Sequence, residues 1–181
     1  QTVSPTLGDN SYNAAVVAVL IVLALVAGLL AYLYRRLAAV AVGALAVWAV
    51  LVYSASAIVS SASNHAVTLA GVAGFVVSLA IAVDSSIVYF ERLKDDVRHG
   101  RTIRNSAERS FRESWRTILA ANFVALLVAI VLYAFTSGTV KSFGLYLGIA
   151  TVANSLVCYL FTRPAVAMLA SRDLLDDEHT F

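Results

Sequence analysis

The sequence of 181 residues is poor in charged residues and has a single cysteine. Only 13% of its residues are charged and 60% are hydrophobic, whereas a soluble domain carries about 25% charged residues. This composition excludes a soluble enzyme, a nucleic-acid-binding domain and a disordered tail. Cys158 lies inside an apolar run, so a disulfide framework and a cysteine-based metal site are excluded as well.

The hydrophobic residues gather in five runs of roughly 19 to 25 residues, each about long enough to cross the hydrocarbon core of a bilayer. The runs predict membrane spans at about 14–34, 37–59, 66–90, 117–135 and 143–161. Core helices of a large soluble protein are the alternative, but five such runs leave no polar surface to dissolve the chain. The predicted fold class is an all-α membrane protein, a polytopic transmembrane bundle of five spans within 14–163.

The cations predict which way the bundle faces. Twelve of the 13 Lys and Arg residues fall on one side, in the first connector, the 91–116 stretch and the C-terminal part, and only Lys141 falls on the other. The positive-inside rule then places the N-terminus outside and the C-terminus in the cytoplasm of a prokaryotic cell. Residues 1–13 become an external tail without a signal-peptide pattern, which predicts an upstream span and external domain. Residues 164–181 become a cytoplasmic tail.

The charged stretch 91–116 is predicted to be a cytoplasmic amphipathic loop. Gly100 divides it as a helix-terminating residue would. After it, an apolar stripe with a spacing of four predicts an amphipathic helix at the inner interface that leads into the fourth span; the stripe is Ile103, Ala107, Phe111 and Trp115. A basic loop that only sets topology, or a docking site for a cytoplasmic or ribosomal partner, are the two open interpretations.

One ionisable side chain stands deep inside a predicted span. Asp84 follows a long uncharged run and precedes six uncharged residues, which puts it about 10 Å from Glu91 at 1.5 Å per residue. A carboxylate at such a depth costs on the order of 2.5–3.5 kcal/mol even on the lenient insertion scale. Such a group suits a proton-relay role. The alternative is a protonated carboxyl group that only forms hydrogen bonds between helices.

Polar neighbours favour the functional interpretation of Asp84. Ser85 and Ser86 follow it directly, and Asn122 lies at a similar depth in the fourth span. These supporting residues could form one wet patch in the inner half of the membrane, although a satisfied hydrogen-bond cluster gives the same sequence pattern.

Small residues recur at helical spacing in the third and fifth spans. Gly71, Gly74 and Ser78 form a ridge in the third span, and Gly144 and Gly148 form a G-x-x-x-G pair in the fifth. Small ridges let membrane helices approach closely, so these residues are predicted helix-packing positions. A carboxylate on a small-residue helix also suggests a helix that packs against a partner and moves.

Three blocks carry a resemblance to a known family: TLAGVAGF at 68–75, AVDSSIV at 82–88 and FERLK at 90–94. Their order and spacing resemble the fourth transmembrane helix of the SecD family of protein-export membrane proteins. Further matches follow in the expected order, at 3–8, 100–103, 117–119, 138–149 and 161–163. The resemblance covers essentially the whole chain.

The resemblance implies a membrane subunit of the Sec export machinery rather than an enzyme. It would form half of a pseudo-symmetric bundle like those of resistance–nodulation–division transporters, with SecF as the other half. Its further partners would be the SecY/SecE/SecG channel, the lipid bilayer and, through the missing external domain, the preprotein, with no nucleic acid. The proton gradient would supply the energy, with no cofactor or metal, and Asp84 would carry the proton.

The sequence departs from the family pattern in one respect. The family commonly has Asp-Ala-Asn in its fourth and fifth helices, whereas this chain has Asp-Ser-Ser at 84–86 and Ala-Ala-Asn at 120–122. The second intramembrane acid is absent, which leaves more of the proton path to SecF.

Two other functions remain open: a proton-coupled exporter of lipids or small molecules of the resistance–nodulation–division type, and a passive scaffold of the translocon. His65, His99 and His179 lie in connectors and the tail and are interpreted as ordinary polar surface.

Overall fold

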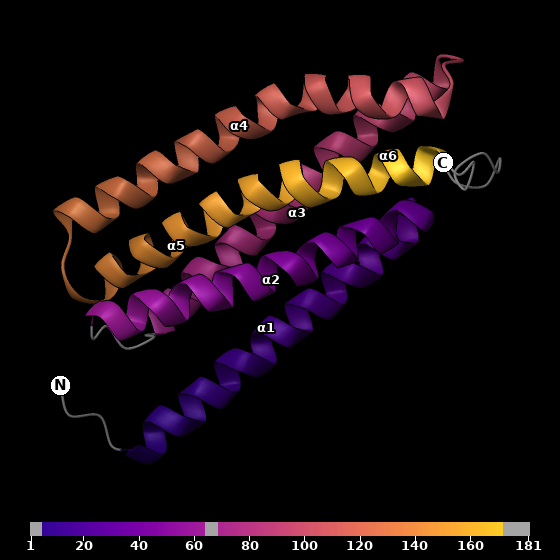
Figure 1. Ribbon diagram of the computed structural model, residues 1–181. Coiled ribbons are helices and arrows are strands. Elements are labelled where there is room, and N and C mark those ends of the chain that lie inside the picture. The colour runs from indigo at the N-terminus through magenta and orange to yellow at the C-terminus, as the bar shows by residue number, and fades with distance from the viewer. Residues whose placement is uncertain (1–4, 64–68, 172–181) are drawn as a thin grey trace.

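The computed structural model describes residues 5–63 and 69–171, and every regular element in them is helical (Figure 1). The elements are α1 (Pro5–Tyr34), α2 (Arg36–Ser63), α3 (Leu69–Arg98), α4 (Ile103–Phe135), α5 (Gly138–Val157), the π-helix η1 (Cys158–Thr162) and α6 (Arg163–Ser171). Five helical stretches are long and apolar enough to cross a membrane: Val17–Tyr34, Leu37–Val59, Gly71–Arg98, Ile103–Phe135 and Gly138–Ser171. The predicted five-span all-α fold class is therefore confirmed.

The helices extend beyond several of the predicted spans. Helix α1 begins at Pro5 rather than at residue 14, α4 begins at Ile103 rather than at 117, and α5 begins at Gly138 rather than at 143. A hydrophobic run marks where a chain meets lipid, but backbone hydrogen bonds continue into water as long as no residue breaks the helix. The sequence therefore predicted the spans better than the ends of the helices.

The predicted C-terminal tail begins as a packed helix. Residues 163–171 form α6, in which Val166 and Ala170 are buried one turn apart, and α6 contacts α4 and α2. The π-turn η1 joins α5 to α6 and ends two residues before Pro164. A proline ring clashes with the carbonyl group four residues earlier in a regular α-helix, and the wider turn accommodates it. Residues 172–181 lie outside the described part of the chain.

Three helices form the centre of the bundle. Helices α3, α4 and α5 pack against one another, and α3 also contacts α1 and α2. Helix α2 packs on α5, where the indole nitrogen of Trp48 donates a hydrogen bond of 3.0 Å to the carbonyl oxygen of Ala150. Helix α1 lies at the edge and contacts only α2 and α3 within the described residues (Figure 1).

The connectors turn on residues with positive φ. Arg35 joins α1 to α2 at φ 40°, and Gly138 opens α5 at φ 60°. Gly100 has φ 80° and follows α3, which ends at Arg98. The prediction that Gly100 terminates a helix is confirmed, because this left-handed conformation is the one a helix C-terminal glycine provides.

The apolar stripe that begins at Ile103 packs inside the chain rather than lying free for a lipid interface. Ala107 and Phe111 are buried, and the ring centroids of Phe111 and Tyr89 lie 5.3 Å apart in an edge-to-face pair. The Tyr89 hydroxyl donates a hydrogen bond of 3.0 Å to the carbonyl oxygen of Ala107. The amphipathic segment is thus the first part of α4, and it packs antiparallel on the end of α3 because Gly100 reverses the chain between them.

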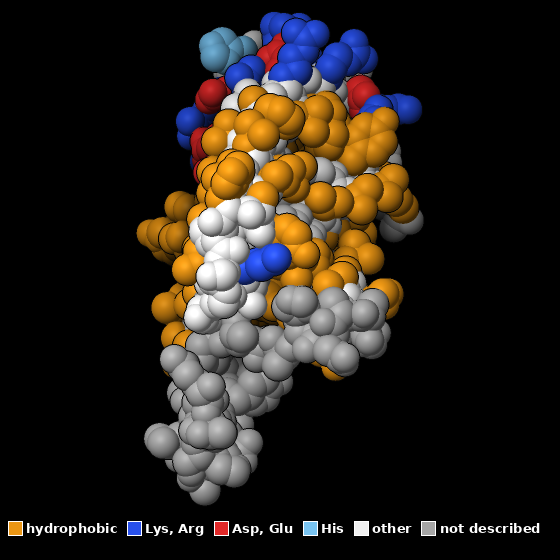
Figure 2. All heavy atoms as spheres, turned by 90° about the vertical axis from the view of Figure 1, so that its left-hand side faces the viewer, with side chains coloured by type: hydrophobic (Ala, Val, Ile, Leu, Met, Phe, Trp, Pro, Cys, Tyr) orange, Lys and Arg blue, Asp and Glu red, His pale blue; other side chains and the backbone are white. Residues whose placement is uncertain are grey.

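The charged side chains gather at one end of the bundle (Figure 2). The α1–α2 junction, the α3–α4 turn and α6 lie at that same end, and the α4–α5 turn lies at the opposite one (Figure 1). Three segments that the sequence assigned to one side of the membrane are therefore brought together by the fold.

Candidate functional site

Asp84 lies on the exposed face of α3. Its side chain is exposed, and no hydrogen bond or ion pair joins it to another residue within 5–63 and 69–171. Three more residues with spacings of four, three and four complete a line of exposed positions along the helix, which we call the α3 stripe: Ala73, Val77, Ala80 and Asp84. The other faces of α3 are covered by α1, α2, α4 and α5. The carboxylate is thus carried on the one open face of the central helix.

A buried hydrogen-bonded cluster lies behind Asp84, between α3, α4 and α5. The side-chain nitrogen of Asn154 donates to the hydroxyl oxygen of Ser85 at 3.0 Å and to the side-chain oxygen of Asn122 at 3.3 Å. The side-chain nitrogen of Asn122 donates in turn to the hydroxyl oxygen of Ser155 at 3.0 Å. Ser85, Asn122 and Asn154 are all at most 5% exposed. This cluster ties the three central helices together.

The structure brings only part of the predicted polar patch together. Ser85 and Asn122 share a partner in Asn154, but Asp84 is outside the cluster, and Ser86 donates to the carbonyl oxygen of Ala82 on its own helix at 3.2 Å. Consecutive helical residues point about 100° apart, so the side chain of Asp84 is exposed while that of Ser85 is buried between the helices. Among the described residues, the hydrogen bonds of the expected patch therefore join Ser85 and Asn122 but not Asp84.

Sequence reasoning missed Asn154, the residue at the centre of the cluster. The available signal was its position, since it is a carboxamide inside the apolar run 143–161 and polar side chains there are costly unless they are paired. Within the described residues, Asn154 contributes two of the side-chain hydrogen bonds that join different helices.

The predicted packing glycines differ in how tightly they are enclosed. A Cβ atom at Gly74 would lie 2.9 Å from the carbonyl oxygen of Phe143, and one at Gly144 would lie 2.9 Å from that of Ala129. These distances agree with close approach of α3 to α5 and of α5 to α4. A Cβ atom at Gly148 would meet its nearest neighbour at an ordinary 3.5 Å. Gly71 and Ser78 are buried on α3.

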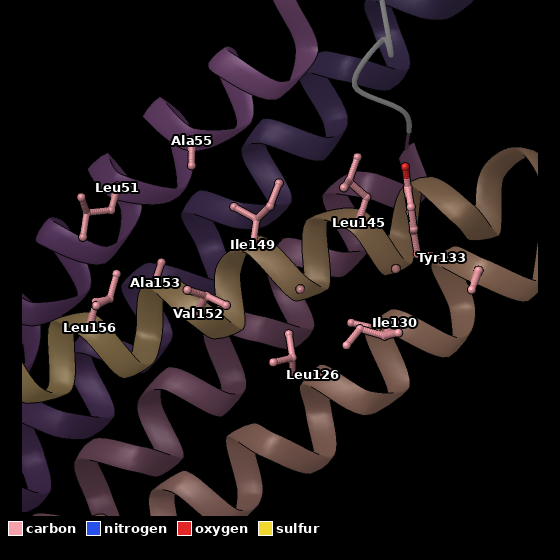
Figure 3. Close-up of a pocket in the computed structure, with 14 residues that line it drawn as sticks. Leu51, Ala55, Leu126, Ile130, Tyr133, Leu145, Ile149, Val152, Ala153 and Leu156 are labelled. Carbon is pink, nitrogen blue, oxygen red and sulfur yellow. The ribbon is translucent and has the colours of Figure 1, made fainter. Parts of the chain in front are cut away.

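An apolar groove of about 530 Å³ runs between α2 and α4, with α5 as its floor (Figure 3). Leu51 and Ala55 line it from α2, and Leu126, Ile130 and Tyr133 line it from α4. Neither Asp84 nor any residue of the buried cluster lines the groove. This groove is therefore separate from the candidate proton-relay residue.

An ion pair, contacts between a guanidinium group and aromatic rings, and a tyrosine hydrogen bond join the helices at the charged end of the bundle. The guanidinium of Arg163 on α6 donates two hydrogen bonds to the carboxylate of Glu108 on α4, at 2.5 and 3.2 Å, and lies over the rings of Phe111 and Tyr159. The Tyr34 hydroxyl donates to Glu91 at 2.8 Å. His99 is exposed at the end of α3, and the other two histidines lie outside the described residues.

The described residues contain no group of three or more His, Cys, Asp or Glu side chains that could hold a metal ion. Cys158 is a buried free thiol. The candidate site thus consists of the exposed carboxylate of Asp84 on α3 and, beside it, the buried hydrogen-bonded cluster of Ser85, Asn122 and Asn154.

Comparisons with known proteins point to one family of membrane proteins. The family model described as "Protein export membrane protein SecD/SecF, C-terminal" matches residues 1–172. The protein translocase subunit SecD of Streptomyces coelicolor is 39% identical over 178 residues, which cover 98% of this chain and 31% of that protein. SecD of Mycobacterium tuberculosis is 35% identical over 175 residues, which cover 97% of this chain and 30% of the relative. The chain thus spans about a third of the length of these relatives.

Two crystal structures of SecDF are similar to the bundle. The structure of SecDF, a translocon-associated membrane protein from Thermus thermophilus, matches with a TM-score of 0.86 and 32% identity, covering 94% of this chain and 23% of that one. SecDF in its super-membrane-facing form matches with a TM-score of 0.83 and 32% identity, covering 93% and 22%. With the sequence resemblance confirmed over nearly its whole length, this multi-pass membrane chain belongs to the SecD/SecF family of protein-export membrane proteins.

Proposed function

We propose that this chain is the membrane part of a SecD subunit that uses the proton-motive force to help complete preprotein translocation across the cytoplasmic membrane of a prokaryote. The observation that carries the proposal is the position of Asp84. An ionisable side chain occupies the open face of the central helix, without a partner in the described part of the chain.

The energetics favour a partner for Asp84 outside this chain. A carboxylate that faced lipid would cost on the order of 2.5–3.5 kcal/mol or more, and the residues beside it on the α3 stripe include the small Ala73 and Ala80. Small residues let a second helix come close. A SecF subunit packed on this stripe would enclose the carboxylate and supply polar groups or water to it.

The proton gradient supplies energy on the scale that such a device needs. Moving one elementary charge through 100 mV is worth about 2.3 kcal/mol, so a few protons per cycle can bias a conformational change. Asp84 would bind a proton from one side and release it to the other. The cluster of Ser85, Asn122 and Asn154 would hold α3 to α4 and α5, so that the three helices move as one body.

The remaining partners follow from the same proposal. The external domain of a longer protein would contact the preprotein, and the bundle would associate with the SecY/SecE/SecG channel. The cations favour an orientation with the charged end, including the α3–α4 turn and α6, in the cytoplasm. No resident cofactor enters the mechanism.

The test replaces the carboxyl group of Asp84 by an amide in the full-length protein that carries this chain. We expect Asp84→Asn to reduce gradient-dependent export to the level seen without the protein, because asparagine cannot release a proton, while association with SecF is kept. The measurement is preprotein translocation into vesicles with an imposed proton gradient. Asp95→Asn is the matched control, since Asp95 is an exposed carboxylate near the end of the same helix.

The outcomes separate this proposal from its alternatives. Full gradient-dependent stimulation by Asp84→Asn would contradict the proton-relay role and favour a passive scaffold of the translocon. Loss of proton flux without any change in preprotein export would favour an exporter of lipids or small molecules.

A further inference from the structure

A second cavity, of about 370 Å³, lies between the ends of α3 and α4 and is rich in arginine. Arg92 lines it from α3, and Arg112, Glu113 and Arg116 line it from α4. We call this cavity the arginine pocket. Nothing in the proposed export mechanism uses it.

The arginine pocket carries an excess of positive charge. Glu113 is already paired, with Arg92 at 3.0 Å and with Arg109 at 3.1 Å. Arg112 and Arg116 are exposed, and neither forms an ion pair with another described residue. Two guanidinium groups are therefore available to a ligand, and the single carboxylate of the pocket is neutralised within the chain.

The position of the pocket along the helices points to the membrane boundary. Arg92 is the first cation after the apolar part of α3, and Arg116 is the last charged residue before the apolar run 117–135 of α4. Both helices therefore leave the hydrocarbon core at the level of the pocket. This is the level at which the phosphate groups of phospholipids lie.

The side chains of the pocket have the chemistry of a phosphate site. The planar guanidinium fork donates paired hydrogen bonds to phosphate oxygens, and basic pockets between transmembrane helices bind anionic lipid head groups. We propose that the arginine pocket binds the phosphate group of an anionic phospholipid, with Arg112 and Arg116 as its principal donors. The ion pair between Arg92 and Glu113 links α3 to α4 within the same pocket. The inference depends only on the membrane bundle and not on the export function.

The experiment titrates phosphatidylglycerol or phosphatidylcholine into the purified full-length protein that carries this chain, in detergent, and counts bound lipid by native mass spectrometry. We expect the wild-type chain to prefer phosphatidylglycerol, and Arg112→Gln/Arg116→Gln to weaken its binding about tenfold or more, as expected for the loss of charge-assisted hydrogen bonds. Phosphatidylcholine binding should not change. The double variant is expected to keep the fold, because neither Arg112 nor Arg116 forms an ion pair with another described residue. Gel filtration checks that it does.

The matched control is Arg98→Gln/Arg104→Gln, which removes the same charge from exposed positions of α3 and α4 outside the pocket. Equal weakening in both double variants would contradict the proposal, because net charge alone would then account for the binding. Unchanged binding in Arg112→Gln/Arg116→Gln would contradict it as well. Release of the lipid by millimolar inorganic phosphate would assign the pocket to free phosphate and overturn the lipid assignment.

Discussion

At Gly144 the backbone of α5 lies against the backbone of α4. A Cβ atom there would come within 2.9 Å of the carbonyl oxygen of Ala129 and of the amide nitrogen of Tyr133, and backbone atoms cannot rotate away as a side chain can. One turn later, at Gly148, a Cβ atom would make an ordinary contact at 3.5 Å. The two glycines of the G-x-x-x-G pair are therefore not equivalent.

We expect Gly144→Ala to lower the free energy of unfolding by about 1–3 kcal/mol, the cost of an overpacked interface. Gly148→Ala should leave it unchanged or raise it by up to about 1 kcal/mol, because alanine favours the helix over glycine. Unfolding of the purified chain in mixed micelles measures both variants against each other. Equal effects of the two substitutions would contradict the described packing of α4 on α5.

Asp84 and Asn154 differ in how easily the sequence reveals their importance. Both are polar residues in apolar runs, and the charge of Asp84 made it conspicuous. The direction of its side chain was not predictable, because the sequence does not set the rotation of α3 about its axis, and a rotation of about 100° would bring Asp84 to the position that Ser85 occupies beside Asn154. Only the packing of α3 against α1, α2, α4 and α5 fixes that rotation.

At the scale of the elements, the turn between α3 and α4 determines how the charged end is built. The backbone at Gly100 has φ 80°, and a Cβ atom there would meet nothing within 4 Å. A side chain at this position would therefore be disfavoured by backbone conformation alone. Gly28 in α1 also has open space around it but no positive φ.

Gly100→Ala is expected to lower the free energy of unfolding by about 1 kcal/mol, the cost of a left-handed conformation for a residue with a Cβ atom. Gly28→Ala is the control with equal space, and it should be neutral or slightly stabilising. Hydrogen exchange of the amides at the end of α3 and the start of α4 would also rise in Gly100→Ala. Identical stability of the two variants would argue against the left-handed turn.

The ends of α4 and α5 show the limit of hydropathy as a guide to the elements. The stretch from Ile103 to Arg116 was predicted as an amphipathic helix at the inner interface that leads into the fourth span, and it is the beginning of α4. No glycine or proline interrupts the chain between it and the fourth span, so the helix continues. The predicted spacing of the apolar stripe was right. The stripe packs against α3 of the same chain, where Tyr89 contacts Ala107 and Phe111.

At the scale of the whole molecule, the bundle leaves one face of its central helix uncovered. The α3 stripe combines small residues with a carboxylate, a surface that suits close contact with another helix. Under the proposed function, SecF packs on this stripe. A bulky side chain placed there should then separate the two subunits.

We expect Ala80→Trp to reduce co-purification with SecF by about tenfold or more, because a large side chain in a close helix contact costs about 1–3 kcal/mol. Val124→Trp is the control, since Val124 is 60% exposed on α4 and outside the stripe. The measurement is affinity capture of the full-length complex from detergent extracts. Retention of SecF by Ala80→Trp, equal to that of the control, would place the subunit contact elsewhere.

The sequence by itself determined the membrane class, the five spans, the family and the isolated carboxylate at Asp84. These depend on hydrophobic run length, charge position and local motifs, which are properties of the chain read in order. The helix rotations, the hydrogen bonds around Asn154, the tight contact at Gly144 and the arginine pocket were decided only by the tertiary structure. Each of them requires side chains from different helices to meet, and the angle at which one helix faces another is set by the packing of all of them together.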